Sequence, residues 1–166
     1  MEWAAAWMAL WSVLGTDPAG PACPVELFRV ARSTNANVVV YEARFAAPGV
    51  LDRRVPVHAS WIMLAADGHR EELNFLEQGL AYGFDAATGP GGRLELRLRA
   101  QPDRPIAVRL RDGCPTAVAT ITDREAILTR IFVSVGGGPF PEVRSVELEG
   151  FDPDSGDEVR EVIPAG

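Results

Sequence analysis

Side chains able to bind an anion surround one predicted turn near the start of the chain. Arg29 and Arg32 precede this turn, Asn35 and Asn37 lie within it, and Tyr41 follows it. The planar fork of an arginine can bind a carboxylate or a phosphate through two hydrogen bonds. Asparagine more commonly holds a turn by adopting left-handed backbone or by bonding its own backbone. We therefore predict that Arg32 binds a ligand and that the two asparagines are mainly structural.

A histidine occupies the next stretch that could do chemistry, Pro56–Ile62. If this stretch is a strand, His58 and Ser60 share one face and Trp61 lies on the other. A catalytic triad would also need an orienting acid and a structured nucleophile turn, and no G-x-S-x-G motif occurs. The sequence therefore leaves His58 as a candidate base and favours a core position for Trp61.

Two further side chains complete the candidate binding set. Tyr82 follows Gly79 and precedes Gly83, a spacing that indicates a bulge or a close backbone approach. Arg104 belongs to an arginine-rich stretch over residues 93–111, where a predicted turn at 101–105 would align arginines in a stripe. The stripe fits a solvated outer face, or a surface that meets an acidic partner or lipid head groups. The candidate ligand-binding residues are Arg29, Arg32, Asn35, Asn37, Tyr41, His58, Tyr82 and Arg104.

No metal or cofactor is expected from the motifs. The chain has neither a phosphate-binding loop nor a dinucleotide fingerprint. The acidic stretch 151–158 fits a hairpin turn better than a calcium loop, because its glycine is misplaced. Cys23 and Cys114 have no histidine or further cysteine at metal-ligand spacing. In an exported protein the two could form a disulfide, and in the cytosol they would stay reduced, so both alternatives stand.

Alternation of apolar and polar residues with period two predicts the elements that carry these side chains. It runs from residue 26 to residue 164 in about ten short segments separated by turn residues, which is typical of an all-β sandwich or barrel. We predict a single antiparallel barrel, or a sandwich, of about 8–10 strands over residues 26–164. A barrel is favoured because closure removes exposed edges. At most one short helix is expected, at residues 71–78.

Residues 1–22 differ from the rest. The apolar run Trp3–Gly15 is too short to span a bilayer and suits the hydrophobic part of a signal peptide, with cleavage near Ala22. Glu2, with no arginine beside it, argues against this reading. The alternative is an apolar helix that docks on the domain of a cytoplasmic protein, with three tryptophans on one face. We expect export to the periplasm or cell surface, and no transmembrane span.

Charge excludes one class of partner. The 166 residues carry a net charge of -7, and all 16 basic residues are arginines. An acidic domain lacks the clustered positive charge that a nucleic-acid backbone requires, so no nucleic-acid partner is expected. The composition does not indicate an oligomeric state.

The motifs together resemble a family of bacterial proteins known only as a domain of unknown function. The resemblance rests on the block from Glu26 to Tyr41, which reads E-L-F-R-V-A-R-S-T-N-A-N-V-V-V-Y, and on P-V-H-A-S-W-I at 56–62. Shorter blocks are A-Y-G at 81–83, R-P-I at 104–106 and I-F-V at 131–133. The likeness covers residues 26 to 164 and implies no established activity.

Three functions remain open on the sequence. The first is a non-catalytic exported β-barrel that binds a small or lipid-like ligand, which barrels of this size can hold. The second is a hydrolase or isomerase that uses His58. The third is an envelope module that contacts other proteins through its surface.

Overall fold

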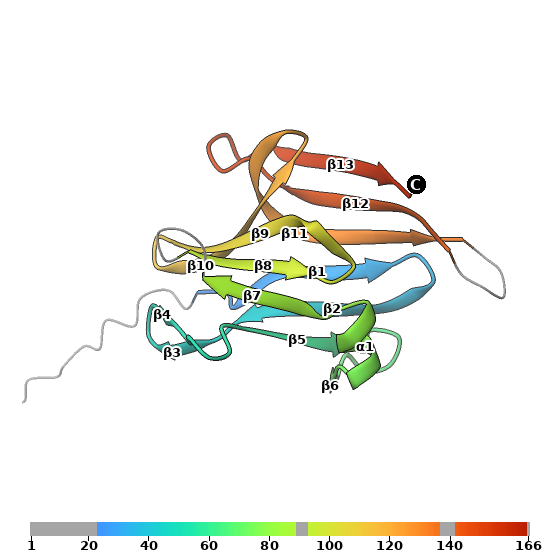
Figure 1. The fold of residues 1–166 in the computed structure, drawn as a ribbon, viewed down its shortest axis with the longest axis horizontal. Helices are drawn as coiled ribbons and strands as arrows, with labels where there is room; N and C mark the ends of the chain where they lie inside the picture. Colours follow the sequence, from blue (N-terminus) through green and yellow to red (C-terminus); the bar gives the residue numbers. More distant parts are fainter. Residues whose placement is uncertain (1–22, 89–92, 137–141, 166) are drawn as a thin grey trace, which may run out of the picture.

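One curled sheet dominates the domain (Figure 1). The structure, a computed structural model, describes residues 23–88, 93–136 and 142–165. The predicted signal peptide or apolar helix at 1–22 lies outside the described residues. The elements are β1 (Glu26–Arg32), β2 (Asn35–Ala43), β3 (Phe45–Ala47), β4 (Val50–Leu51), β5 (Val57–Ile62), β6 (Arg70–Glu72), α1 (Phe75–Leu80), β7 (Phe84–Thr88), β8 (Leu94–Leu98), β9 (Gln101–Arg111), β10 (Cys114–Ile121), β11 (Arg124–Val135), β12 (Val143–Phe151) and β13 (Glu158–Pro164).

The sheet follows the order β6-β5-β2-β1-β11-β10-β9-β8-β7, and β12 and β13 branch from β11. It curls into a half-barrel, and its two ends do not pair with each other. The all-β class is therefore confirmed, whereas the closed barrel is not formed. The described residues place 11 strands in this sheet, more than the 8–10 expected, and β3 and β4 pair separately.

One ladder departs from the antiparallel prediction. Strand β1 pairs with β11 in parallel, with Arg29 opposite Arg130 and Arg32 opposite Val133. The other ladders of the described residues are antiparallel. Alternation within a strand carries no information about the direction of its neighbour, which explains why the sequence did not predict this pair.

The segment between β6 and β7 joins the two edge strands of the half-barrel and packs against its core. Leu73 and Tyr82, at its two ends, are each 4% exposed and belong to the main core. Between them α1 begins with a capping box in which Asn74 and Glu77 bond each other's backbone N–H groups. The predicted helix at 71–78 thus exists but starts later, because Glu71 lies in the short edge strand β6.

Strand bounds follow the alternation closely along most of the chain. The residue pattern predicts a short strand over residues 80–85, but helix α1 ends at Leu80 and β7 begins only at Phe84. The prediction also fails at 101–105, which lie inside the long strand β9 rather than in a turn. The arginine stripe is therefore not arranged as expected.

A disulfide joins Cys23, just before β1, to Cys114 at the start of β10. Cys114 follows a two-residue hairpin turn in which Asp112 and Gly113 both have positive φ. Within the described residues, no helix has the length and apolar character needed to cross a bilayer.

Candidate functional site

The concave side of the sheet is a packed core. Phe28 stacks on Tyr41 with ring centroids 4.4 Å apart, and Phe84 meets Tyr41 edge-on at 5.9 Å. A cavity left in this core beside Ile131 and Leu148 measures about 10 Å³, which is too small for an organic ligand. The core therefore leaves no room for an organic ligand at this cavity, whereas larger hollows lie at the ends of the half-barrel.

Tyr41 belongs to this core and not to a binding surface. Its side chain is 0% exposed, and its hydroxyl donates a hydrogen bond of 2.7 Å to the carbonyl oxygen of Tyr82. Burial raises the pKa of Tyr41 far above its ordinary value, since the phenolate would lose its hydration. The placement of Tyr41 among the candidate binding residues is not supported by its position.

Three of the predicted residues do come together at the end of the half-barrel that carries α1. They line a hollow of about 330 Å³, here called the mouth. Figure 1 places α1 at the end of the domain opposite the β3–β4 hairpin. The residues of the mouth are Arg32, Asn35, Trp61, Leu76, Glu77, Ala81 and Tyr82.

Arg32 is the distinctive side chain of the mouth. Its guanidinium carbon lies 4.7 Å from the centroid of the Tyr82 ring, a cation–π contact. Its Nε atom is buried without a hydrogen-bond partner among the described residues. None of the ion pairs within that part of the chain includes Arg32. The Nε of Arg109 is also unpartnered, but both terminal nitrogens of that arginine bind Glu125.

The other walls of the mouth are aromatic, aliphatic and acidic. Trp61 meets Tyr82 edge-on, with ring centroids 5.0 Å apart. Burial raises the pKa of Tyr82, while the charge of Arg32 acts in the opposite direction. Glu77 also lines the mouth, but its carboxylate accepts a hydrogen bond of 2.9 Å from the Asn74 backbone in the capping box. The mouth therefore offers one cation without a partner beside apolar surface.

The side chains of the two asparagines both accept hydrogen bonds from backbone N–H groups. Both lie in β2, and neither has positive φ. Asn35 accepts a hydrogen bond of 2.9 Å from the Asn37 backbone, which is an Asx turn. Asn37 accepts one of 2.9 Å from the backbone of Ala65 and so ties down the connection between β5 and β6.

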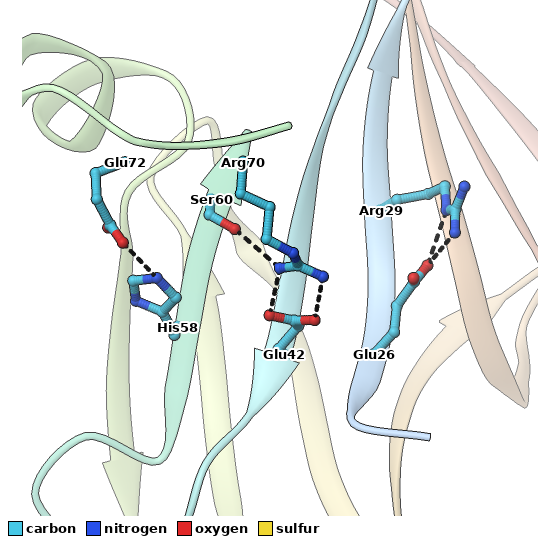
Figure 2. A network of polar contacts seen from close by, with 7 residues as sticks. All are labelled: Glu26, Arg29, Glu42, His58, Ser60, Arg70 and Glu72. Atoms are coloured by element: carbon cyan, nitrogen blue, oxygen red, sulfur yellow. Dashed lines mark hydrogen bonds and ion pairs between the residues drawn. The ribbon is translucent and has the colours of Figure 1, made fainter. Parts of the chain in front are cut away.

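Two predicted arginines are already paired with carboxylates. Arg29 donates two hydrogen bonds, of 2.8 and 2.6 Å, to Glu26 (Figure 2). Arg104 binds Glu161 through both terminal nitrogens, at 2.8 and 2.6 Å. The hydrogen bonds from Arg104 lower the pKa of Glu161. Both guanidinium groups are thus already paired with a carboxylate. Their positions do not favour a role in ligand binding.

His58 lies on the outer face of the sheet, because its neighbours Val57 and Ala59 on β5 point into the core. Figure 2 shows His58 among the polar side chains of this face. Its Nε2 atom is 3.1 Å from Glu72, and both residues line a hollow of about 380 Å³. Ser60 lies on the same face, as the alternation predicted, but its hydroxyl accepts a hydrogen bond from Arg70. Arg70 in turn binds both oxygens of Glu42. The network thus offers His58 an acid partner but engages the neighbouring hydroxyl elsewhere.

A larger hollow of about 670 Å³ lies at the other ends of β2 and β5. None of the predicted site residues lines it. Its floor includes Leu94 and Val108, and its rim includes Thr88 and Arg93, which flank residues outside the described ranges.

Sequence reasoning missed Trp61, Leu76, Glu77 and Ala81 as parts of the mouth. The alternation of β5 correctly assigned Trp61 to the core side, where it packs against the main core. It does not reveal that Trp61 lies at the exposed end of the strand, next to a helix. An aromatic residue on the apolar face of a predicted strand, near the end of that strand, is the sequence signal that could have indicated it.

Comparison with known proteins places these features in a family. A family model described as a domain of unknown function, DUF4833, matches residues 28–162. The chain belongs to this family. The DUF4833 match runs from within β1 to within β13, so it includes all the residues of the mouth. No curated protein and no solved structure matches the chain.

Proposed function

We propose that this DUF4833 domain is an exported, non-catalytic binding module that takes the anionic group of a small or lipid-like ligand at its mouth. The observation that carries the proposal is Arg32, whose Nε is buried without a partner and whose guanidinium is held by the Tyr82 ring. An unpaired donor in a partly dehydrated site gains more from a charged acceptor than a solvated arginine does. A carboxylate or phosphate would supply that acceptor.

Export is supported by the disulfide between Cys23 and Cys114. Disulfides persist in the periplasm and at cell surfaces and are rare in the cytosol. Cleavage near Ala22 would place the new N-terminus beside this bridge. N-terminal sequencing of the protein from its native host tests this part, and recovery of intact Met1 from the cytosol would contradict it.

Benzoate and benzamide provide the test of the mouth, because they share a shape and differ in charge. In the full-length protein, benzoate should shift the Arg32 Nε–H signal and the Trp61 indole signal in nuclear magnetic resonance spectra. Benzamide should shift them much less. Arg32→Gln should weaken benzoate binding about tenfold or more, as expected for the loss of a charge-assisted pair.

Arg29→Gln is the matched control, since Arg29 lies on the same strand but is paired with Glu26 on the outer face. It should leave benzoate binding unchanged. Arg32→Gln should also leave the free energy of unfolding nearly unchanged. Equal binding by the Arg32 variant, or its failure to fold, would show that Arg32 is a structural residue and that the proposal is wrong.

A variant of Glu77 tests the same proposal in the opposite direction. Its carboxylate lines the mouth and should weaken the binding of any anion. Glu77→Gln keeps the capping box, because glutamine serves at that position as well. This variant should bind benzoate more tightly, with little change in its binding of benzamide.

A further inference from the structure

A row of aliphatic side chains leads away from Arg32 across three strands. Arg32 lies opposite Val133 in the parallel β1–β11 ladder, Val133 lies opposite Val146, and Val146 lies opposite Ile163. Residues directly opposite each other in a sheet share a face. Here it is the core face, because all three aliphatic residues pack against the main core. We call Val133, Val146 and Ile163 the apolar row.

At the apolar row, the apolar side chains of the core face are partly exposed to solvent. One step inward along β11 and β12, Ile131 and Leu148 are 4% and 3% exposed. The residues of the row are only partly buried. On β13 the residue next to Leu148 is Glu161, and Arg104 of β9 donates a hydrogen bond to its carboxylate. Strands lie about 4.8 Å apart, so the row extends about 14 Å from Arg32.

We infer that the ligand of the mouth is a single-chain anionic amphiphile, an alkyl carboxylate, whose chain lies along the apolar row. This inference rests on the proposed function and adds the class of ligand. Arg32 would hold the carboxylate at one end of the row. The row is one side chain wide and carries no charged group, so it fits one flexible chain and gives that chain apolar surface to cover. Glu161, one step inward on β13, is bound by both terminal nitrogens of Arg104, so its charge is balanced there.

The test is a series of alkanoates that differ only in chain length. Acetate, hexanoate and decanoate, the last below its micelle-forming concentration, are titrated into the full-length protein. Full burial of a methylene strengthens binding about fourfold, so a half-buried chain should gain about twofold per methylene. Magnetization transfer from the decanoate methylenes should reach the methyl groups of Val133 and Val146 in the unaltered protein.

Val146→Thr is the variant that should remove most of the dependence on chain length, because it puts a hydroxyl in the middle of the row. Val162→Thr is its control. Val162 is 54% exposed and lies opposite Glu147 on the outer face of the same two strands. In this control variant, the affinity for alkanoates should still rise fully with the length of the alkyl chain.

The outcomes separate the inference from the proposed function. If benzoate binding depends on Arg32 but alkanoates of all lengths bind equally, the mouth binds anions and the inference is wrong. The inference is also wrong if the gain in affinity with alkanoate length disappears in Leu76→Ser and survives in Val146→Thr. The alkyl chain would then cover α1 and not the apolar row. If neither benzoate nor any alkanoate depends on Arg32, the proposed function itself fails.

Discussion

At position 83 the backbone leaves no room for a side chain. A Cβ atom on Gly83 would overlap the carbonyl oxygen of Gln78, which is backbone and cannot move aside. The carbonyl oxygen of Gly83 accepts a hydrogen bond of 2.9 Å from the backbone N–H of Arg99, so the segment between β6 and β7 is held at this point. Gly79, four residues earlier, differs, because a Cβ atom there would meet no other atom within 4 Å.

Gly83→Ala should lower the free energy of unfolding by about 3 kcal/mol or more, because the segment must shift to remove the overlap. Gly79→Ala is the matched control, since Gly79 lies in α1 and a Cβ atom there would meet nothing within 4 Å. It should raise stability by about 0.5–1 kcal/mol through helix propensity. Urea denaturation of both variants measures the contrast. Equal effects would contradict the close approach at Gly83.

For single residues, the sequence predicted which side chains belong to the candidate site better than it predicted which residues they contact. Arg32, Asn35 and Tyr82 were singled out and do meet in the mouth. Arg29 and Arg32 are an odd number of positions apart on one strand, so alternation alone assigns them to opposite faces. The partner of Arg104 is Glu161, at a sequence separation of 57 residues. Such a pairing depends on the tertiary fold, and spacing along the chain does not reveal it.

Among the elements, two hairpin turns have the same backbone but different residues. Asp112 and Gly113 join β9 to β10, and Thr122 and Asp123 join β10 to β11. All four have positive φ, from 49° to 80°, which is typical of the two-residue turn that favours Asn-Gly or Asp-Gly. Thr122 is β-branched and is strained in this region. Its backbone N–H donates a hydrogen bond of 2.9 Å to Glu161, which helps to hold the turn.

The double variant Thr122→Asn with Asp123→Gly should raise the free energy of unfolding by about 1 kcal/mol or more, since both new residues suit positive φ. Gly113→Ala should lower it by about 1 kcal/mol. Nothing lies within 4 Å of a Cβ at that position, so its cost would come from the backbone alone. Thermal unfolding of the two variants measures whether stability rises in the double variant and falls in Gly113→Ala. A stabilised Gly113→Ala variant would contradict the backbone conformation of this turn.

The elements themselves were largely predictable, because their signal is local. Strands β1, β8 and β10 to β13 follow the alternation within a few residues. Strands β4 and β6 each have three residues or fewer, which is too few for the alternation to show. The turn predicted at 101–105 lies within β9, where Pro102 and Pro105 are part of an exposed stretch of the strand. Tertiary pairing overrode the local turn preference there.

For the whole molecule, the absence of lysine makes alkaline stability simple to interpret. The two cysteines form a disulfide and do not titrate. Between about pH 9 and pH 12 the remaining titrating side chains are the two tyrosines. Both are buried, at 0% and 4% exposure, and burial raises both pKa values.

A phenol with a raised pKa in the folded state keeps its proton at a pH where the unfolded chain has lost it. Stability is then full below the unfolded pKa of about 10 and falls as the pH rises above it. The fall should approach about 1.4 kcal/mol per pH unit for each tyrosine. Tyr41→Phe should reduce the slope, although it leaves the Tyr82 carbonyl unsatisfied and lowers stability at neutral pH. Urea denaturation at about pH 9 and pH 11 provides the measurement, and equal stability at both would contradict the burial of the two phenols.

The parallel β1–β11 ladder also has a consequence for the order in which the chain assembles. The strands before α1 are joined by short connections, and so are the strands after it, so each half contains mostly local contacts that form quickly. Among the described strands, the two halves pair with each other through one ladder, in which Arg29 to Arg32 align with Arg130 to Val133. Closing this long loop is the slow step expected of such a topology. The disulfide, with a sequence separation of 91 residues, links the same two halves. Oxidation before folding would therefore speed assembly by bringing the halves together in advance.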